Sequence, residues 1–178
     1  MAKKRILVAL NNSIAGAGKD TIADYLVEQH GFKKYSLSEW IYEVAWNVYG
    51  IERGVKPPRK LLHHIGESLR DYDKMVWLKL TMRNIESEGH EKVVITDVRK
   101  GLEHFYLKEH GFNNVKIVCE KEVAIKRMVE RDGTVDTKLV LGSTLETELS
   151  SVDMEEIDNS GDWESTVEQI EFFLKKLK

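Results

Sequence analysis

A glycine-rich turn followed by a lysine is the most distinctive chemical pattern in this chain, at Gly16-Ala17-Gly18-Lys19-Asp20-Thr21. Glycines let backbone N–H groups close around anionic oxygens, and the lysine adds a positive charge on a long stem. The apolar run Ile6–Leu10 before the turn predicts a buried strand, and the amphipathic run Ile22–Gln29 predicts a helix whose positive end points at the turn. Strand, glycine turn, lysine and helix in this order predict a phosphate-binding loop.

The loop departs twice from the usual pattern G-x-x-x-x-G-K-[ST]. Ser13 stands where the first glycine would be, and Asp20 stands where the pattern has a magnesium-binding hydroxyl. The alternative is an ordinary strand-to-helix turn with a surface lysine. We favour the phosphate-binding interpretation and expect Lys19 to reach the phosphates between which charge moves.

A carboxylate ends a second apolar run, in which Val93–Ile95 predicts a buried strand that leads to Asp97. An Asp at a strand end beside a phosphate loop commonly orients magnesium or its waters. The alternative is a helix cap or turn residue, because Asp is frequent in both. Arg99 follows two residues later and favours the functional interpretation.

Two arginines four residues apart, Arg127 and Arg131, share one face of the helix that the pattern predicts over Lys121–Asp132. Such a pair usually forms a solvated basic face. In a protein that transfers phosphate, the two guanidinium groups would instead clamp the transferring group. Both interpretations stay open at this point.

Strands and helices alternate along the 178 residues, of which 42% are apolar and 32% are charged. This composition suits one domain with a sizeable core. The alternation predicts a parallel sheet with helices on both faces, and ligands bind at the carboxyl ends of such strands. The glycine loop, Asp97 and Arg99 all lie at such ends, so one edge of the sheet should collect them.

The net charge of −3 indicates no dedicated nucleic-acid surface and no membrane surface. No stretch is long and apolar enough to span a bilayer. Cys119 is the single cysteine, so an internal disulfide is excluded and a reducing, cytoplasmic location is expected.

The segment after the first helix predicts a short strand and then a helix from Ser36 to Tyr49, with capping-box spacing between Ser36 and Glu39. That helix carries more aromatic side chains than one buried stripe needs. A thick core contact is the favoured interpretation, and an aromatic wall for a flat base is the alternative. A loop at 51–58 and two further helices complete the segment.

Four segments, GAGKDT, RKLLHHIGESLRDYDKMVW, VVITDVR and EIDNSGDWESTVEQI, resemble the deoxynucleoside monophosphate kinases of the phage type. These kinases belong to the P-loop NMP-kinase-like group, together with dephospho-CoA kinase and adenylate kinase. The resemblance extends from Ile6 to Leu177 and implies a three-layer α/β/α P-loop NTPase fold with a parallel, five-stranded sheet. It also implies one domain over 1–178, a helical substrate-binding segment at about 36–88 and a short lid at about 121–138.

The resemblance implies ATP and Mg²⁺ as cofactors and small-molecule nucleotides as partners. The implied metal residues are Asp20 and Asp97, and the implied catalytic residues are Lys19, Arg99, Arg127 and Arg131. The implied ATP-binding residues are Ser13, Ala15, Gly16, Ala17, Gly18, Lys19, Asp20 and Thr21 in the loop, with Asn159 and Ser160 near the adenine. The acceptor would contact Ser36, Trp40, Arg70, Trp77 and Arg99. His63 and His64 stand where relatives tend to have glutamine, so the base that is recognised stays open.

Three functions remain at this stage. The first is an ATP-dependent kinase of (deoxy)nucleoside monophosphates, which needs no general base because the second phosphate pKa of such an ester lies near 6. The second is a kinase of the same fold for another small molecule, such as dephospho-CoA or phosphomevalonate. The third is a nucleotide-binding regulator with little or no turnover, which the departures at Ser13 and Asp20 support. The oligomeric state is open, a homodimer included.

Overall fold

The computed structural model describes residues 5–133, 148–149 and 152–177. The chain divides into two compact units, one formed by Met1–Lys34 with Glu91–Lys178 and the other by Tyr35–His90. The far end of the expected lid, residues 134–138, lies outside the described residues. No helix in the described ranges is long and apolar enough to cross a membrane.

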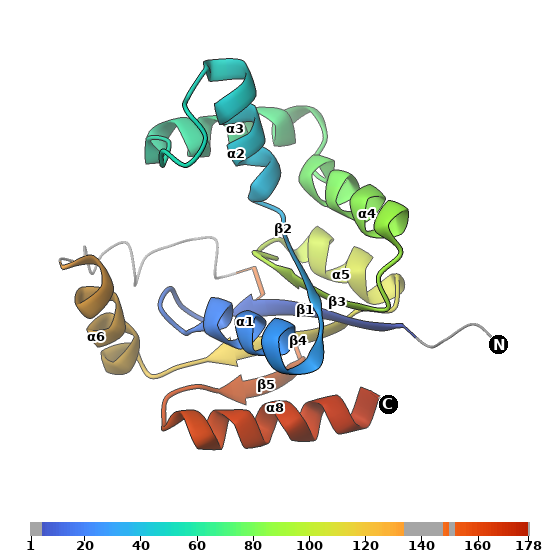
Figure 1. Ribbon diagram of the computed structural model, residues 1–178, viewed down its shortest axis with the longest axis vertical. Coiled ribbons are helices and arrows are strands. Elements are labelled where there is room, and N and C mark those ends of the chain that lie inside the picture. The colour runs from blue at the N-terminus through green and yellow to red at the C-terminus, as the bar shows by residue number, and fades with distance from the viewer. Residues whose placement is uncertain (1–4, 134–147, 150–151, 178) are drawn as a thin grey trace. The chain divides into compact units, whose positions relative to one another are not determined.

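The first unit contains the sheet together with the helices α1, α5, α6 and α8 (Figure 1). In chain order the elements are β1 (Ile6–Asn12), α1 (Lys19–His30), β2 (Lys33–Ser36), β3 (Lys92–Thr96), α5 (Gly101–Glu109), β4 (Asn113–Val118), α6 (Lys121–Asp132), β5 (Glu155–Asp158) and α8 (Trp163–Leu177). β2 begins in this unit and ends in the other. The five strands have the order β2-β3-β1-β4-β5, and the predicted five-stranded sheet with flanking helices is confirmed.

β1 lies at the centre of the sheet because its apolar run pairs on both sides. It is parallel to β3, with Leu7 opposite Val93, and parallel to β4, with Leu10 opposite Val115. Parallel neighbours need long crossover connections, which here are the helices between consecutive strands. All carboxyl ends therefore meet at one edge of the sheet, and the turn after β1 lies at that edge.

The core of this unit is the layer of apolar side chains between the sheet and the helices α1 and α8, which Figure 1 shows side by side. Ile22 and Leu26 of α1 pack into the same cluster as Ile170 and Phe173 of α8. All four are buried. The beginning of α1 is therefore fixed by packing along its length, and this packing positions the glycine loop that precedes it.

The second unit consists of the end of β2 and three helices, α2 (Glu39–Tyr49), α3 (Arg59–Tyr72) and α4 (Val76–Glu88). The predicted start of the second helix at Ser36 is wrong. β2 extends to Ser36, whose hydroxyl lies 2.8 Å from that of Ser38, and α2 begins at Glu39. The predicted capping box is therefore not formed, because the strand occupies its first position.

Candidate phosphate-binding site

The loop between β1 and α1 has a backbone that requires glycine at two positions. Gly16 has φ of +83° and Gly18 has φ of +87°, in a region that L side chains rarely adopt. A Cβ atom on Gly16 would lie 2.8 Å from the carbonyl oxygen of Ala124, and one on Gly18 would collide with Nδ2 of Asn159. Both glycines therefore allow other elements to approach the loop closely.

The first turn of α1 offers backbone donors toward this loop. Gly18 is the N-cap and, lacking a side chain, gives no side-chain cap bond to the first turn. The first N–H groups of any helix have no intrahelical partner, and together with the helix dipole they favour an anion. Lys19, Asp20 and Thr21 all lie in this turn. The arrangement suits a phosphate group, as the sequence predicts.

Lys19 and Asp97 are brought together from the start of α1 and the end of β3. Lys19 is 8% exposed, and its Nζ lies 3.0 Å from Oδ1 of Asp97. The same carboxylate oxygen lies 3.7 Å from Nη2 of Arg99, whose side chain is half exposed. The charge on Lys19 is thus held at the mouth of the loop by a carboxylate from a neighbouring strand.

Asp97 has a backbone conformation that few residues tolerate. It is the one non-glycine residue of the described chain with positive φ, at 66°. Such a conformation costs about 1–3 kcal/mol and persists where surrounding contacts hold it, although Asp and Asn tolerate it better than other residues. The contact with Lys19 gives this strained position a partner, so the backbone at Asp97 serves to aim its carboxylate.

A buried glutamate that the sequence analysis missed holds the segment after Asp97. Glu103 is 1% exposed, and its Oε2 accepts hydrogen bonds from the backbone N–H groups of Arg99 and Lys100, both at 3.1 Å. Glu103 is the third residue of α5 and forms the carboxylate half of a capping box, because the ammonium group of the N-cap residue Lys100 cannot accept the reciprocal bond. The sequence has the glutamate of the Ser/Thr-x-x-Glu pattern but a lysine at its first position, so the signal for Glu103 was weak.

Asn159 connects the loop to the end of β5. Its Nδ2 donates to the carbonyl oxygen of Ala17 at 2.8 Å, and its backbone N–H donates to Val118 at 2.9 Å. Thr166 of α8, fully buried, donates from Oγ1 to Oδ1 of Asn159 at 3.1 Å. The side-chain amide therefore holds the loop backbone, a role that the sequence analysis did not foresee. Thr166 was also missed, although a threonine in the first turn of an otherwise amphipathic helix was a weak signal.

Arg127 lies beside the loop and is not part of a solvated face. Its Nη1 donates to the carbonyl oxygen of Asn159 at 2.7 Å and lies 3.9 Å from the Cβ position of Gly18. The same nitrogen lies 3.5 Å from Sγ of Cys119, and burial raises the pKa of that thiol. Arg131, one turn further along α6, is exposed.

Ser160 also lies at the end of β5, where its Oγ accepts from the backbone N–H of Glu120 at 2.9 Å and donates to Asp158. Asp20 has a side chain that is 70% exposed and lies within 3.6 Å of the Lys34 ammonium. Ser13 donates its backbone N–H to Ile117 at 2.9 Å, which ties the start of the loop to β4.

The remaining predicted residues belong to the second unit. Trp77 is 1% exposed and donates from Nε1 to the carbonyl oxygen of Gly66 at 3.0 Å, so it forms part of that unit's core. Trp40 donates to Thr81 at 3.1 Å. Arg70 is mostly buried and pairs with Glu67 at 3.1 Å. Their contact with an acceptor stays a prediction, as does that of Ser36.

Comparison with known proteins agrees with this fold. The family model described as AAA domain matches residues 12–158. The solved structure of TT1252 from Thermus thermophilus has a TM-score of 0.66 and 16% identity, covering 99% of this chain and 100% of that one. A sugar kinase from Janibacter sp. HTCC2649 has a TM-score of 0.53 and 18% identity, covering 97% and 95%.

Dephospho-CoA kinase from Campylobacter jejuni has a TM-score of 0.52 and 16% identity, covering 98% of each chain. At these identities the likeness shows the fold alone. No curated protein sequence matches the chain significantly.

Proposed function

We propose that this chain, which belongs to the AAA domain family over residues 12–158, is a kinase. In this proposal it transfers the γ-phosphoryl group of ATP to a nucleoside monophosphate, deoxynucleotides included. The observation that carries this proposal is the buried Lys19 at the start of α1, behind two left-handed glycines and 3.0 Å from Asp97. Lysine, loop amides and helix terminus are the parts that hold the β- and γ-phosphates in P-loop enzymes.

In the proposed reaction an oxygen of the acceptor phosphate forms a bond to the γ-phosphorus. The bond from that phosphorus to the bridging oxygen breaks, and ADP leaves with the electron pair. The acceptor phosphate is already largely ionised at neutral pH, so the protein needs no general base. Its task is to position the groups and to offset negative charge, for which Lys19 and Arg127 lie beside the loop.

Asp97 and Asp20 are the residues that would hold Mg²⁺. Carboxylate oxygens are suitable ligands, and magnesium binds through one or two carboxylates while keeping several waters. Asp97 lies at the loop with a partly exposed side chain, and Asp20 is open to solvent in the first turn of α1, so both can accept a hydrated ion. When bound, the ion would offset charge on the phosphates.

The nucleoside monophosphate is proposed on the resemblance of the GKDT and TDVR segments to the phage-type kinases, and on the presence of arginines beyond Lys19. A second candidate acceptor is another small phosphorylated metabolite. The likeness in fold to the Campylobacter jejuni dephospho-CoA kinase, over 98% of each chain, supports that alternative.

A coupled assay of ADP release should identify the acceptor. We expect the highest rate with one of the ribo- or deoxynucleoside monophosphates, in a panel that also contains dephospho-CoA and phosphomevalonate. The same panel is run with Lys19→Met protein that is purified in parallel. Its rate of ADP release measures the activity of contaminating kinases and is subtracted. A rate confined to dephospho-CoA or phosphomevalonate would replace the nucleotide by the second candidate, and no rate above the control would favour a slow regulator.

Asp97→Asn is expected to lower turnover by about tenfold and to weaken the response to magnesium, because the charge facing Lys19 and the ion is lost. Asparagine tolerates the left-handed backbone, so the melting temperature should change little. Asp97→Ala is the matched comparison, since alanine adds the backbone strain at φ of 66° and should lower the melting temperature as well. Full activity of Asp97→Asn with a lowered melting temperature would instead indicate a purely structural residue.

A further inference from the structure

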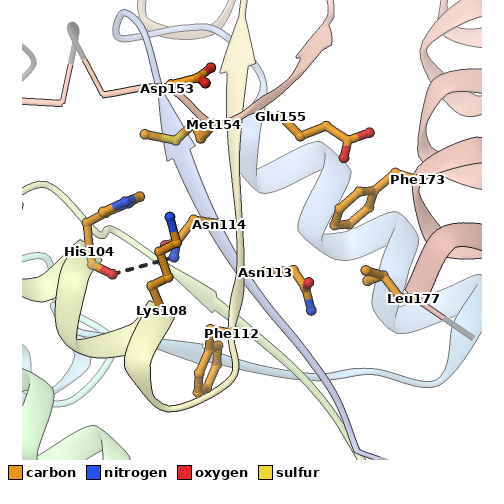
Figure 2. A pocket seen from close by; sticks show the side chains of 10 residues that line it. All are labelled: His104, Lys108, Phe112, Asn113, Asn114, Asp153, Met154, Glu155, Phe173 and Leu177. Atoms are coloured by element: carbon orange, nitrogen blue, oxygen red, sulfur yellow. Dashed lines mark hydrogen bonds between the residues drawn. The ribbon is translucent and has the colours of Figure 1, made fainter.

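A pocket lies at the edge of the sheet opposite to the phosphate-binding loop. It has a volume of about 210 Å³ and is formed where β4 and β5 begin, whereas the loop follows the carboxyl end of β1 (Figure 2). Its lining includes His104, Lys108, Phe112, Asn114, Met154 and Phe173. They come from α5, β4, α8 and the segments that lead into β4 and β5, all in the first unit.

Two polar side chains of this pocket have buried atoms that lack a hydrogen-bond partner. His104 is 1% exposed, and neither of its ring nitrogens has a partner among the described residues. The same holds for Oδ1 of Asn114, whose Nδ2 donates to the His104 carbonyl oxygen at 3.5 Å (Figure 2). Buried polar atoms of native proteins are nearly always bonded, so each exception calls for an explanation.

The chemistry of these atoms specifies a neutral, hydrogen-bonding edge. Burial, with a smaller contribution from the Lys108 charge, lowers the pKa of His104, so its ring is neutral at physiological pH. A neutral imidazole offers one donor and one acceptor, and the amide oxygen of Asn114 offers a second acceptor. A matching ligand must therefore present N–H groups to the imidazole acceptor and to the Asn114 oxygen, and an acceptor to the imidazole N–H. It must also be uncharged at that edge because a buried charge is costly.

The apolar part of the lining favours a small, flat molecule. Phe112 and Phe173 are each 4% exposed and line it with the half-buried thioether of Met154. Aromatic and thioether groups pack well against the face of a ring. The volume is below the range of about 300–1,000 Å³ that is typical of ligand sites, which limits the buried part of the ligand to about one ring system.

We propose that this pocket binds a nucleobase, free or as the base of a nucleoside, with its hydrogen-bonding edge toward His104 and Asn114. Purines and pyrimidines combine a flat apolar face with neighbouring N–H groups and acceptors on one edge. The face matches the aromatic and thioether lining, and the edge offers the hydrogen-bond partners that His104 and Asn114 lack. The site is separate from the phosphate-binding loop, and it stands whether or not the chain is a kinase.

The test is a titration followed by NMR of the histidine ring nitrogens in the full chain. Adenine, hypoxanthine, cytosine and thymine are added in turn, with excess pyrophosphate, which carries no base, present to occupy the phosphate-binding loop. We expect at least one base to shift the His104 ring signals in a saturable manner and to leave those of His110 unchanged. The His110 ring is exposed and bonded to the Tyr106 carbonyl oxygen, so it reports non-specific effects.

Variants make the test specific. His104→Phe keeps a ring and removes both nitrogens, and it should weaken binding of that base at least tenfold, as followed by the shift of backbone amides at β4. His110→Phe is the matched control and should leave binding unchanged. Should His104→Phe fail to fold, Met154→Trp, which fills the pocket from a half-buried position, should abolish binding.

Three outcomes would overturn the proposal. One is the absence of a saturable shift at millimolar concentrations of all four bases. Another is equal binding of indole, which has a similar ring without the complementary edge and would show an apolar hollow only. The third is a high-resolution crystal structure, grown with the bases, in which ordered waters alone satisfy His104 and Asn114.

Discussion

Lys19→Met is expected to lower the rate of phosphoryl transfer by at least about a hundredfold in a protein that still folds. Removing a single charge-stabilising donor from an active site costs about 10²–10³ in turnover. Methionine retains an unbranched apolar stem, so the packing around this side chain, which is 8% exposed, is largely kept. The melting temperature should fall only modestly, because Asp97 is partly exposed and also faces Arg99. The rate is measured at saturating ATP and acceptor.

The matched control is Lys34→Met. Lys34 lies on β2, pairs with Asp24 of α1 at 2.9 Å and lies 3.6 Å from Asp20, so this variant removes a positive charge beside the same helix and leaves Lys19 and the loop glycines in place. Its side chain is 31% exposed, and pairs of this kind contribute little. Turnover should remain close to that of the unaltered chain. Near-normal turnover of a folded Lys19→Met protein would contradict the assignment of the phosphate-binding loop.

The sheet could be predicted because its determinants are local and repeated. Short apolar runs alternate with amphipathic ones, and that alternation restricts the topology to parallel strands with crossover helices. The start of α2 was predicted wrongly because the serine-to-glutamate spacing fits a helix cap wherever it occurs. Pairing within the sheet decided the matter instead, since β2 continues to Ser36 before the helix begins.

The centre of the site was predictable for the same reason. The rule that carboxyl ends of parallel strands gather at one edge places Asp97 beside Lys19, although the two are 78 positions apart in sequence. The contacts that hold the loop were not predictable, because the side chain of Asn159 reaches Ala17 across 142 positions. Its use as a support for the loop backbone depends on how β5 and α8 pack, which no local pattern encodes.

Gly18→Ala is expected to destabilise the chain by about 2–5 kcal/mol, the second large effect. An L residue at φ of +87° costs about 1–2 kcal/mol, and forcing a methyl group against the Asn159 amide adds about 1–3 kcal/mol. The displaced amide should also release the Ala17 carbonyl, so ATP binding should weaken in the same variant. Urea unfolding gives the first quantity and calorimetric titration with ATP gives the second.

Gly31→Ala separates backbone strain from crowding. Gly31 ends α1 with φ of +69°, and a Cβ atom there would meet no other atom within 4 Å, so only the strain of about 1–2 kcal/mol is expected and ATP binding should be unchanged. In the double variant Gly18→Ala with Asn159→Ala, the space for the new methyl group is opened, and the destabilisation should be smaller than the sum of the two single effects. Equal costs at Gly18 and Gly31, or strict additivity in the double variant, would mean that Asn159 does not press on the loop.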